Sequence, residues 1–401
     1  MSTPKTLAPL RLKKKEERRL HTGHLWVFSN EVDVAHTPLT GFEPGQLVSI
    51  EASNGAVLGT GYVNPHSLIC ARLVSRDPHY VLDQSLLVHR LNIALSLRER
   101  LFDKPYYRLV FGDSDALPGL VVDRYGDVLV AQLTTAGMER VKTEVIAALQ
   151  KVIKPRAIVL RNDTSSRALE GLPKYIETAL GEVPERVRLE ENGVQFDIPV
   201  LTGQKTGWFY DHRMNRARMQ HYVKDRRVLD VFSYLGGWGV QAAAAGASEV
   251  LCVDSSQSAL DQLRHNAALN NVSERVAAVH SDAFDALKSL RAERQKFDVV
   301  ILDPPAFIKR KKDHKQGLQA YHQLNQMAMQ VLAKDGILIS ASCSHHLEPD
   351  ALQNVLLQTS RHVDRNLQIL EQGQQGPDHP IHPAIPETRY LKAFFARVYL
   401  S

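Results

Sequence analysis

The spacing of apolar and polar positions changes twice along the chain. Over residues 1–80, short apolar runs alternate with turn signals, and Asn54-Gly55 between two β-rich runs is typical of a hairpin. Repeated turns of this kind predict a small, mostly β barrel. Over residues 84–185 the pattern becomes mixed, and we expect a small α+β domain.

The elements of this middle stretch follow from its apolar spacing. An apolar stripe at helical spacing predicts a helix over residues 83–101. We then expect a two-strand hairpin that turns at Gly126-Asp127, a helix over residues 137–152, and a strand over residues 157–163.

The last stretch, residues 187–401, opens with a hairpin at Asn192-Gly193 and then alternates apolar strand runs with helical patterns. Regular alternation of this kind predicts an α/β fold with a doubly wound, Rossmann-like sheet. The strands are expected at residues 228–232, 250–253, 276–280, 297–303, 336–342, 367–371 and 390–400. In such a sheet, ligands bind at the carboxyl ends of the parallel strands.

The first strand of this alternation leads into a glycine-rich turn with Gly236, Gly237 and Gly239. Glycines let a backbone approach a ligand closely, so strand, turn, helix and strand together predict a nucleoside cofactor site. The glycine spacing is not the one that holds a pyrophosphate, which disfavours a dehydrogenase. Asp230, just before the turn, suits the cationic end of S-adenosylmethionine, and Asp254 after the next strand suits its ribose.

Four successive strands of this stretch end in an acid: Asp230, Asp254, Asp282 and Asp303. Because parallel strands bring their carboxyl ends to one edge, we expect these acids to lie along a single site. Asp282 is assigned to the adenine side of the cofactor and Asp303 to the substrate side. The turn 303–307, DPPAF, fits either an exocyclic amine or the edge of a pyrimidine.

Cys343 follows the fifth strand of the alternation and favours a pyrimidine. Carbon 5 of a pyrimidine is a poor nucleophile until a thiolate adds to carbon 6. The thiol must therefore ionise readily, and His345, His346 or the amino terminus of the next helix are candidates to help. Cys70 and Cys252 lie inside apolar runs and are interpreted as core thiols.

Charge and composition indicate the kind of partner and the cellular compartment. The formal net charge of +5 hints at a polyanionic partner, and Arg213, Arg216 and Arg218 are candidates for contacts with backbone phosphate. Three cysteines favour a reducing cytoplasm over a disulfide framework. We expect no metal site, no signal peptide at the amino terminus and no membrane span. The oligomeric state stays open, with a homodimer as one option.

Five motifs together carry a resemblance that covers essentially the whole chain. They are GQKTGWFYDHRMNR, LDVFSYLGGWG, LDPPAF, SCSHH and DHPIHPAIPETRYLK. The chain resembles the RlmI-type cytosine-5 methyltransferases of large-subunit ribosomal RNA, which are class I enzymes dependent on S-adenosylmethionine. The resemblance implies a PUA-like RNA-binding barrel over residues 1–80, an α+β middle domain over 84–185 and a methyltransferase domain over 187–401.

The resemblance also implies roles for individual residues. Cys343 would be the nucleophile, and Asp303, or water held by it, is assigned to the carbon-5 proton or to product release. Better-known RNA cytosine-5 enzymes carry a second cysteine where Ala306 stands here, which leaves that step open. The resemblance also implies residues that would cover or line the cofactor: Gln204, Lys205, Thr206, Tyr210, Asp230, Ser233, Gly236, Asp254, Asp282 and Asp303. Ala283 directly follows Asp282 and is placed with it beside the adenine.

Two alternatives to cytosine methylation remain open on the sequence. The first is another RNA methylation, at carbon 5 of uridine or at N6 of adenine. The second is a non-catalytic RNA-binding assembly factor that keeps the fold.

Overall fold

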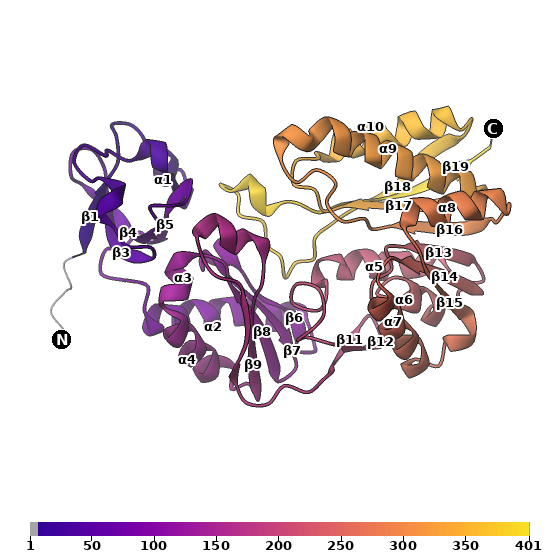
Figure 1. Ribbon diagram of the computed structural model, residues 1–401, viewed down its shortest axis with the longest axis horizontal. Coiled ribbons are helices and arrows are strands. Elements are labelled where there is room, and N and C mark those ends of the chain that lie inside the picture. The colour runs from indigo at the N-terminus through magenta and orange to yellow at the C-terminus, as the bar shows by residue number, and fades with distance from the viewer. Residues whose placement is uncertain (1–6, 401) are drawn as a thin grey trace. The chain divides into compact units, whose positions relative to one another are not determined.

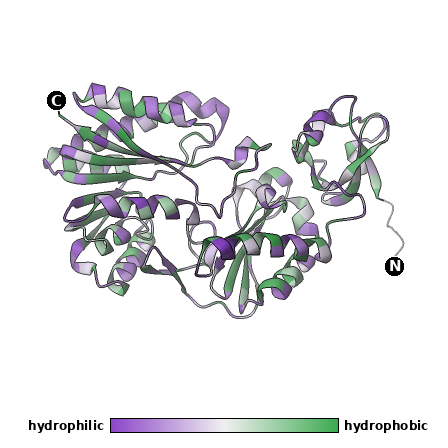
Figure 2. Cartoon of the chain, turned by 180° about the vertical axis from the view of Figure 1, so that it is seen from behind, coloured by the Kyte–Doolittle hydropathy of each residue, from purple (hydrophilic) through white to green (hydrophobic). Residues whose placement is uncertain are grey.

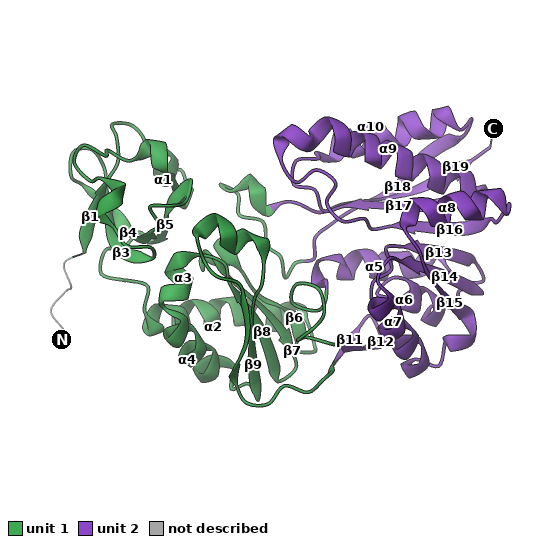
Figure 3. Ribbon diagram, in the orientation of Figure 1, with its two compact units in different colours: residues 1–187, 199–208, 377–388 green, residues 188–198, 209–376, 389–401 purple. Residues whose placement is uncertain are grey.

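The computed structural model describes residues 7–400, which form two compact units (Figure 3). Unit 1 contains the chain up to residue 187 together with residues 199–208 and 377–388, and unit 2 contains the remainder. The first six residues, where we expect no signal peptide, lie outside the described part. Within residues 7–400, no helix has both the length and the apolar character needed to cross a membrane.

The first sheet of unit 1 is the predicted small β structure (Figure 1). Its five strands lie in the order β1-β3-β4-β5-β2. The hairpin between β3 and β4 turns through Asn54-Gly55, and Gly55 has a φ of 84° that favours glycine. Cys70 is fully buried in the core, as the sequence predicts. The elements are β1 Ala8–Arg11, α1 Arg18–His21, β2 Trp26–Phe28, β3 Gln46–Glu51, β4 Val57–Val63 and β5 Ile69–Ser75.

The second sheet of unit 1 also has five strands, in the order β10-β9-β8-β7-β6. Two of them, β6 and β10, were not predicted, and the single helix expected over residues 137–152 is two helices that meet at Val141. The apolar spacing runs through this break, so the sequence pattern does not reveal it. The elements are α2 Gln84–Leu101, β6 Tyr106–Phe111, β7 Leu120–Tyr125, β8 Val128–Leu133, α3 Ala136–Arg140, α4 Lys142–Ile153, β9 Ala157–Asn162 and β10 Tyr175–Leu180.

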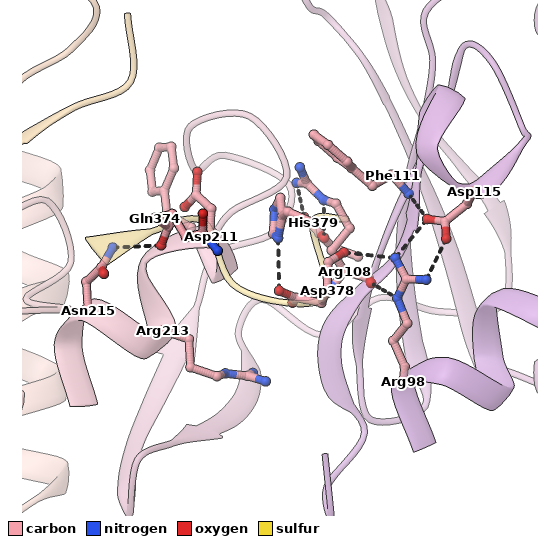
Figure 4. A network of polar contacts seen from close by, with 12 residues as sticks. Arg98, Arg108, Phe111, Asp115, Asp211, Arg213, Asn215, Gln374, Asp378 and His379 are labelled. Carbon is pink, nitrogen blue, oxygen red and sulfur yellow. Dashed lines mark hydrogen bonds and ion pairs between the residues drawn. The ribbon is translucent and has the colours of Figure 1, made fainter. Parts of the chain in front are cut away.

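The loop after β18 belongs to unit 1, although it is far away in the sequence. Its Asp378 is fully buried. One carboxylate oxygen accepts a hydrogen bond from the Arg108 amide at 2.9 Å, and the Asp378 carbonyl accepts one from Arg98 at 2.8 Å. The Arg98 guanidinium also forms a two-point ion pair with Asp115 (Figure 4). This network ties the loop to β6 and α2.

Unit 2 is built on the predicted doubly wound sheet, which has seven strands in the order β15-β14-β13-β16-β17-β19-β18. The first five of these run parallel, and β19 is antiparallel to both of its neighbours. The strands are β13 Arg227–Val231, β14 Glu249–Asp254, β15 Val276–His280, β16 Phe297–Leu302, β17 Leu332–Ser342, β18 Asn366–Gln374 and β19 Lys392–Tyr399.

Helices cover both faces of this sheet. On one face, Leu229 and Val231 pack in a common core with apolar residues of α8, α9 and α10. On the other face α6 approaches so closely that a Cβ on Gly239 would lie 2.4 Å from the Cys252 sulfur. The central parallel strands β13 and β16 are accordingly mostly apolar, whereas the helices have one polar and one apolar side (Figure 2). The helices are α5 Arg213–Met219, α6 Gly239–Ala244, α7 Gln257–Leu269, α8 Ala283–Ala292, α9 His314–Val331 and α10 Pro349–His362, and the predicted hairpin is β11 Val187–Glu191 with β12 Val194–Ile198.

The strand order reverses between β13 and β16. From β13 the chain continues outward to β14 and β15, and from β16 it continues the opposite way to β17. A crevice outside the carboxyl ends at such a reversal is where open α/β sheets bind ligands. The topology therefore directs attention to the residues that follow β13 and β16.

Candidate active site

The acids and the thiol singled out in the sequence line up along the carboxyl edge of the unit 2 sheet. In the order of the strands β15, β14, β13, β16 and β17, they are Asp282, Asp254, Asp230, Asp303 and Cys343. Each neighbouring pair of these strands is parallel, so consecutive groups sit on adjacent strand ends. The structure confirms that these strand ends share one edge.

The turn that leaves β13 has an unusual backbone. Phe232, Tyr234 and Gly236 all have positive φ, at 68°, 48° and 85°. The amides of Phe232 and Ser233 both donate to the Val253 carbonyl, at 2.9 and 3.0 Å, which pins the turn to β14. A Cβ on Gly236 would lie 2.6 Å from a methyl group of Val240. Strain of this kind persists where the surroundings enforce it, and it is frequent at ligand sites.

Asp230 is fully buried below this turn. Its Oδ2 accepts a hydrogen bond from the Gly239 amide at 2.8 Å, whereas Oδ1 has no hydrogen-bond partner within residues 7–400. Burial, together with the charges of Asp303 and Asp254, raises the pKa of Asp230 to about 8. A buried carboxylate with one unsatisfied oxygen is costly unless a cation or a donor meets it.

Ser233 has the same character, because its buried hydroxyl oxygen also lacks a partner within the described chain. The cationic amino acid end of S-adenosylmethionine carries both a positive charge and N–H donors. Asp230 and Ser233 therefore fit this cofactor: one offers the negative charge and both offer acceptors. At Gly236 and Gly239, the space that a Cβ would need is filled by Val240 and by the Cys252 sulfur, so their part in cofactor binding stays a prediction.

The next two acids along the edge have different environments. Asp254 accepts hydrogen bonds from the amides of Tyr234 and Ser256, each at 2.9 Å, and stays partly exposed. Asp282 is exposed and its Oδ1 accepts from the amide of Phe284 at 2.8 Å, which caps α8. Ala283 is buried in the first turn of that helix. Both acids sit at strand ends as expected, and their cofactor contacts stay predictions.

Asp303 is held by two side chains that the sequence reading did not single out. The His212 Nε2 lies 3.1 Å from Oδ1, and the Trp238 indole N–H donates to Oδ2 at 3.0 Å. Burial opposes ionisation of Asp303, but the charge and hydrogen bond of His212 outweigh it and hold its pKa below the usual range. Burial likewise disfavours charged His212, and Asp303 overrides this and raises the histidine pKa. Each of the two groups therefore favours the charged form of the other.

Cys343 lies just past β17, half-buried, and forms no disulfide. Its thiol donates to the Pro304 carbonyl at 3.9 Å, so it faces the turn after β16. The serines on either side of it are both hydrogen-bonded to the Tyr321 hydroxyl, at 2.8 and 2.9 Å. Ser344 also accepts from the Ile308 amide at 3.2 Å. These bonds fix the loop 343–348, here called the cysteine loop, against the turn 303–307, here called the Asp303 turn.

An aromatic side chain borders the same turn. The Phe307 ring packs 4.9 Å from Tyr321 and 6.4 Å from Phe284, measured between centroids. Helix α9 can approach because residue 317 is a glycine, since a Cβ there would lie 2.8 Å from the Phe307 carbonyl oxygen. The Phe307 ring is therefore fixed by packing.

The residues expected to cover the cofactor fall in both units. Tyr210 is fully buried in unit 2, with the Arg213 guanidinium 5.1 Å from its ring centre. Gln204, Lys205 and Thr206 belong to unit 1, where the Tyr125 hydroxyl donates to the Thr206 carbonyl at 3.0 Å. The buried Thr206 hydroxyl has no partner within residues 7–400. Their role as a cover stays a prediction.

One expectation from the sequence is wrong. Arg216 is buried, and its guanidinium binds the equally buried Glu191 at 2.6 Å and the Phe209 carbonyl at 2.6 Å. Arg213 is also buried and lies 3.6 Å from the same carboxylate, while Arg218 pairs with Glu371 at 3.4 Å. Arg216 therefore cannot reach a phosphate, because an internal acid that is distant in sequence occupies it.

Within residues 7–400, no three histidine, cysteine, aspartate or glutamate side chains are grouped so that they could hold a metal ion. Cys252 is fully buried beside Asp230, and burial raises the pKa of its thiol well above the usual value. Cys343 is the one cysteine at the strand edge that is not buried.

Comparison with known proteins gives matches over nearly all of the chain. Residues 166–397 match the family described as S-adenosylmethionine-dependent methyltransferase, and residues 10–76 match a PUA-like domain. "Ribosomal RNA large subunit methyltransferase I" from Aliivibrio fischeri is 37% identical over 96% of this chain and 98% of its own length. The protein of the same name from Erwinia tasmaniensis is 38% identical, with the same coverage.

A solved structure agrees with these matches at the level of the fold. SMU.776, crystallised with SAH, superposes with a TM-score of 0.83 at 21% identity. The match covers 98% of this chain and all of that one (100%). A class I methyltransferase fold behind an amino-terminal PUA-like domain is therefore shown, as the sequence predicts. The boundaries at 80, 84–185 and 187 stay predictions.

Proposed function

Because the chain belongs to the S-adenosylmethionine-dependent methyltransferase family, we propose that it methylates carbon 5 of a cytosine in large-subunit ribosomal RNA through a covalent adduct at Cys343. The class of RNA is suggested by the names of relatives that match nearly all of the chain. The PUA-like domain supports RNA as the partner. The Cys343 thiol lies beside the Asp303 turn, and this position favours carbon 5 of a pyrimidine over an exocyclic amine as the methyl acceptor.

We expect the methyl donor to bind at the carboxyl ends of the neighbouring strands β15, β14 and β13. Bound S-adenosylmethionine supplies an electrophilic methyl group. The unsatisfied oxygen of Asp230 and the Ser233 hydroxyl would hold its amino acid end, and Asp254 its ribose. Asp282 and Ala283 would border the adenine, with Gln204, Lys205, Thr206 and Tyr210 closing over the cofactor. The glycine turn keeps these groups in place before any ligand arrives.

The acceptor side uses the turn after β16 and the cysteine loop. The Cys343 sulfur adds to carbon 6 of the cytosine, which makes carbon 5 nucleophilic toward the methyl group. After methylation, carbon 5 loses its proton and the carbon–sulfur bond breaks, which restores the aromatic ring and the thiolate. The base must leave its stack to reach this site, as in other enzymes that modify bases.

Asp303 is the group placed for the proton step. Its two oxygens are oriented by His212 and Trp238, so a water molecule held by the carboxylate would sit in a fixed place. The depressed pKa makes Asp303 itself a weak base. We therefore assign it to hold the water that receives the carbon-5 proton, with His212 keeping the carboxylate charged.

The RNA is held mainly by shape and phosphate contacts, for which the PUA-like domain and the net positive charge are suited. We place the reaction in the cytoplasm, where ribosomal RNA is processed and where thiols stay reduced. A homodimer is a further prediction, which sedimentation of the purified chain would test.

Nucleoside mass spectrometry tests the proposal. Large-subunit ribosomal RNA from cells that lack this protein is incubated with the purified chain and methyl-labelled S-adenosylmethionine, and is then digested. We expect the label in 5-methylcytidine. Label in 5-methyluridine or N6-methyladenosine would replace the proposed acceptor, and cofactor binding without any transfer would favour the assembly factor.

A further inference from the structure

A buried lysine stands beside the loop that carries Cys343. Lys392 is the first residue of β19 and only 4% exposed. In the sheet it pairs with Ser342, the residue before Cys343. Lysine is rarely buried without a partner, because its ammonium group is costly to remove from water.

The ammonium of Lys392 is anchored on the loop itself. It donates hydrogen bonds to the carbonyl of Ser344, the residue after Cys343, and to the Tyr390 carbonyl at 3.0 Å. Within the described residues, no carboxylate lies within ion-pair distance of it. Neutral carbonyls orient the ammonium but do not neutralise it.

Burial and three nearby charged groups determine the pKa of Lys392. Burial lowers the pKa of Lys392 to about 8, the charge of Cys343 and then that of Glu348 raise it, and Arg389 lowers it. The Glu348 side chain is 73% exposed, so solvent screens its charge, and it lies 4.0 Å from Arg389. His345 borders the same cavity of about 170 Å³ as Lys392. The Cys343 sulfur is the strongest favourable charge in this set.

We propose that Lys392 is a positioning residue that holds Cys343 as a thiolate and fixes the loop that carries it. The inference deepens the proposed function and rests on it for its catalytic meaning. The ammonium stays protonated, and the proton of the thiol leaves to water. A positive charge anchored on the next carbonyl lowers the free energy of the sulfur anion without a donor in the path of the incoming base.

The alternative is a purely structural tie, in which the lysine only holds the loop in place. The two roles separate in the ionisation of the thiol. A structural tie changes the stability of the loop but leaves the pH dependence of thiol reactivity unchanged. An electrostatic role moves that pH dependence, and a second cation should restore it.

Alkylation of the intact protein by iodoacetamide, followed by peptide mass spectrometry between pH 5 and 10, makes this test without RNA or cofactor. Cys70 and Cys252 are fully buried, so the rapid label reports Cys343. We expect Lys392→Met to move the midpoint of labelling up by at least about one pH unit, a tenfold slower reaction at pH 7. Lys392→Arg should stay near the wild-type midpoint, and Lys334→Met, an exposed lysine on β17, is the matched control.

The same midpoint in Lys392→Met and in the wild type would overturn the proposal. Should Lys392→Met fail to fold, the reciprocal measurement remains: Cys343→Ser should lower the pH at which the Lys392 ammonium titrates by NMR, and no change would overturn the proposal equally. Failure of the proposed function is seen separately. A Cys343→Ala protein that still methylates RNA would remove the nucleophile but leave the labelling result intact.

Discussion

Two fully buried aspartates, one in each unit, differ in how their oxygens are used. In unit 1, both oxygens of Asp123 accept hydrogen bonds from the Arg108 guanidinium, at 2.9 and 2.8 Å. In unit 2, Asp230 has one backbone donor and one unsatisfied oxygen. The hydrogen-bonding capacity of the Asp123 carboxylate is satisfied within the fold. The second oxygen of Asp230 needs a donor or a cation from a ligand.

The difference distinguishes buried polar groups that stabilise the fold from buried polar groups that await a ligand. A saturated buried pair contributes to the fold, and removing one member leaves an uncompensated charge. An unsaturated buried group weakens the fold and persists where a ligand offsets its cost. Substitutions at Asp123, Asp230 and His212 test this contrast.

Asp123→Asn should be the most damaging of these changes. The Arg108 guanidinium, whose side chain is 14% exposed, would lose the negative charge of Asp123, at a cost of roughly 3–5 kcal/mol in the free energy of unfolding. Urea denaturation followed by circular dichroism measures this. The control is Asp127→Asn, whose pair with Arg156 is largely exposed and should matter little. Equal losses in both variants would contradict the contrast.

Asp230→Asn should instead make the protein more stable in the absence of ligand. The folded-state pKa of Asp230, about 8, lies above its usual value, so its contribution is fully present at low pH and is lost as pH rises through that pKa. The gain from the substitution should be near zero at pH 4 and reach on the order of 2–4 kcal/mol at pH 8. Denaturation midpoints across this range give the answer. A loss of stability at pH 8 would show that the carboxylate is structural.

Cofactor affinity should depend on pH through the same group. A cationic ligand favours the ionised form of Asp230, so affinity for S-adenosylmethionine should rise by up to about tenfold per pH unit from pH 6 and level off above pH 8. Calorimetric titration in several buffers measures both the affinity and the protons released. In Asp230→Asn the binding should be weaker and flat with pH. A flat profile in the wild type would rule out this linkage.

His212→Gln tests the pair at the substrate side and should have the smallest effect. The histidine pKa is raised, so its contribution is present below its usual pKa and is lost as pH rises through the folded-state pKa. The Asp303 pKa is lowered, so its contribution disappears as pH falls through that value. The variant should lose about 1–2 kcal/mol near pH 5.5 and less at pH 8.5. A loss that grows with pH would contradict the assigned charges.

The sequence predicts the edge of the site better than its interior. The acids and Cys343 could be placed because strand ends are marked by local patterns, and parallel pairing then brings them together. The contacts of Asp303 with His212 and Trp238 join residues 91 and 65 positions apart, and no local pattern encodes such pairings. Lys392 escaped notice for the same reason, since it meets the Ser344 carbonyl 48 positions away.

Charge patterns in the sequence misled where burial decides. Arg216 sits in a polar, basic segment that suggested a solvated, phosphate-binding face, yet Glu191 draws it into the interior. Asp282 was assigned to the cofactor, and the structure also gives it a local task as the cap of α8. Which charged group faces solvent depends on tertiary packing, which periodicity alone does not supply.

The central claim is that Cys343 bonds to carbon 6 of the target cytosine. Its most direct test uses large-subunit ribosomal RNA transcribed with 5-fluorocytidine, because fluorine at carbon 5 cannot leave as a cation and the adduct therefore persists after methylation. With S-adenosylmethionine present, we predict a protein–RNA complex that survives denaturation and whose cross-linked peptide contains Cys343, with none formed by Cys343→Ala. Methylation of ordinary RNA by Cys343→Ala at the wild-type rate, with no trapped complex in the wild type, would contradict the account.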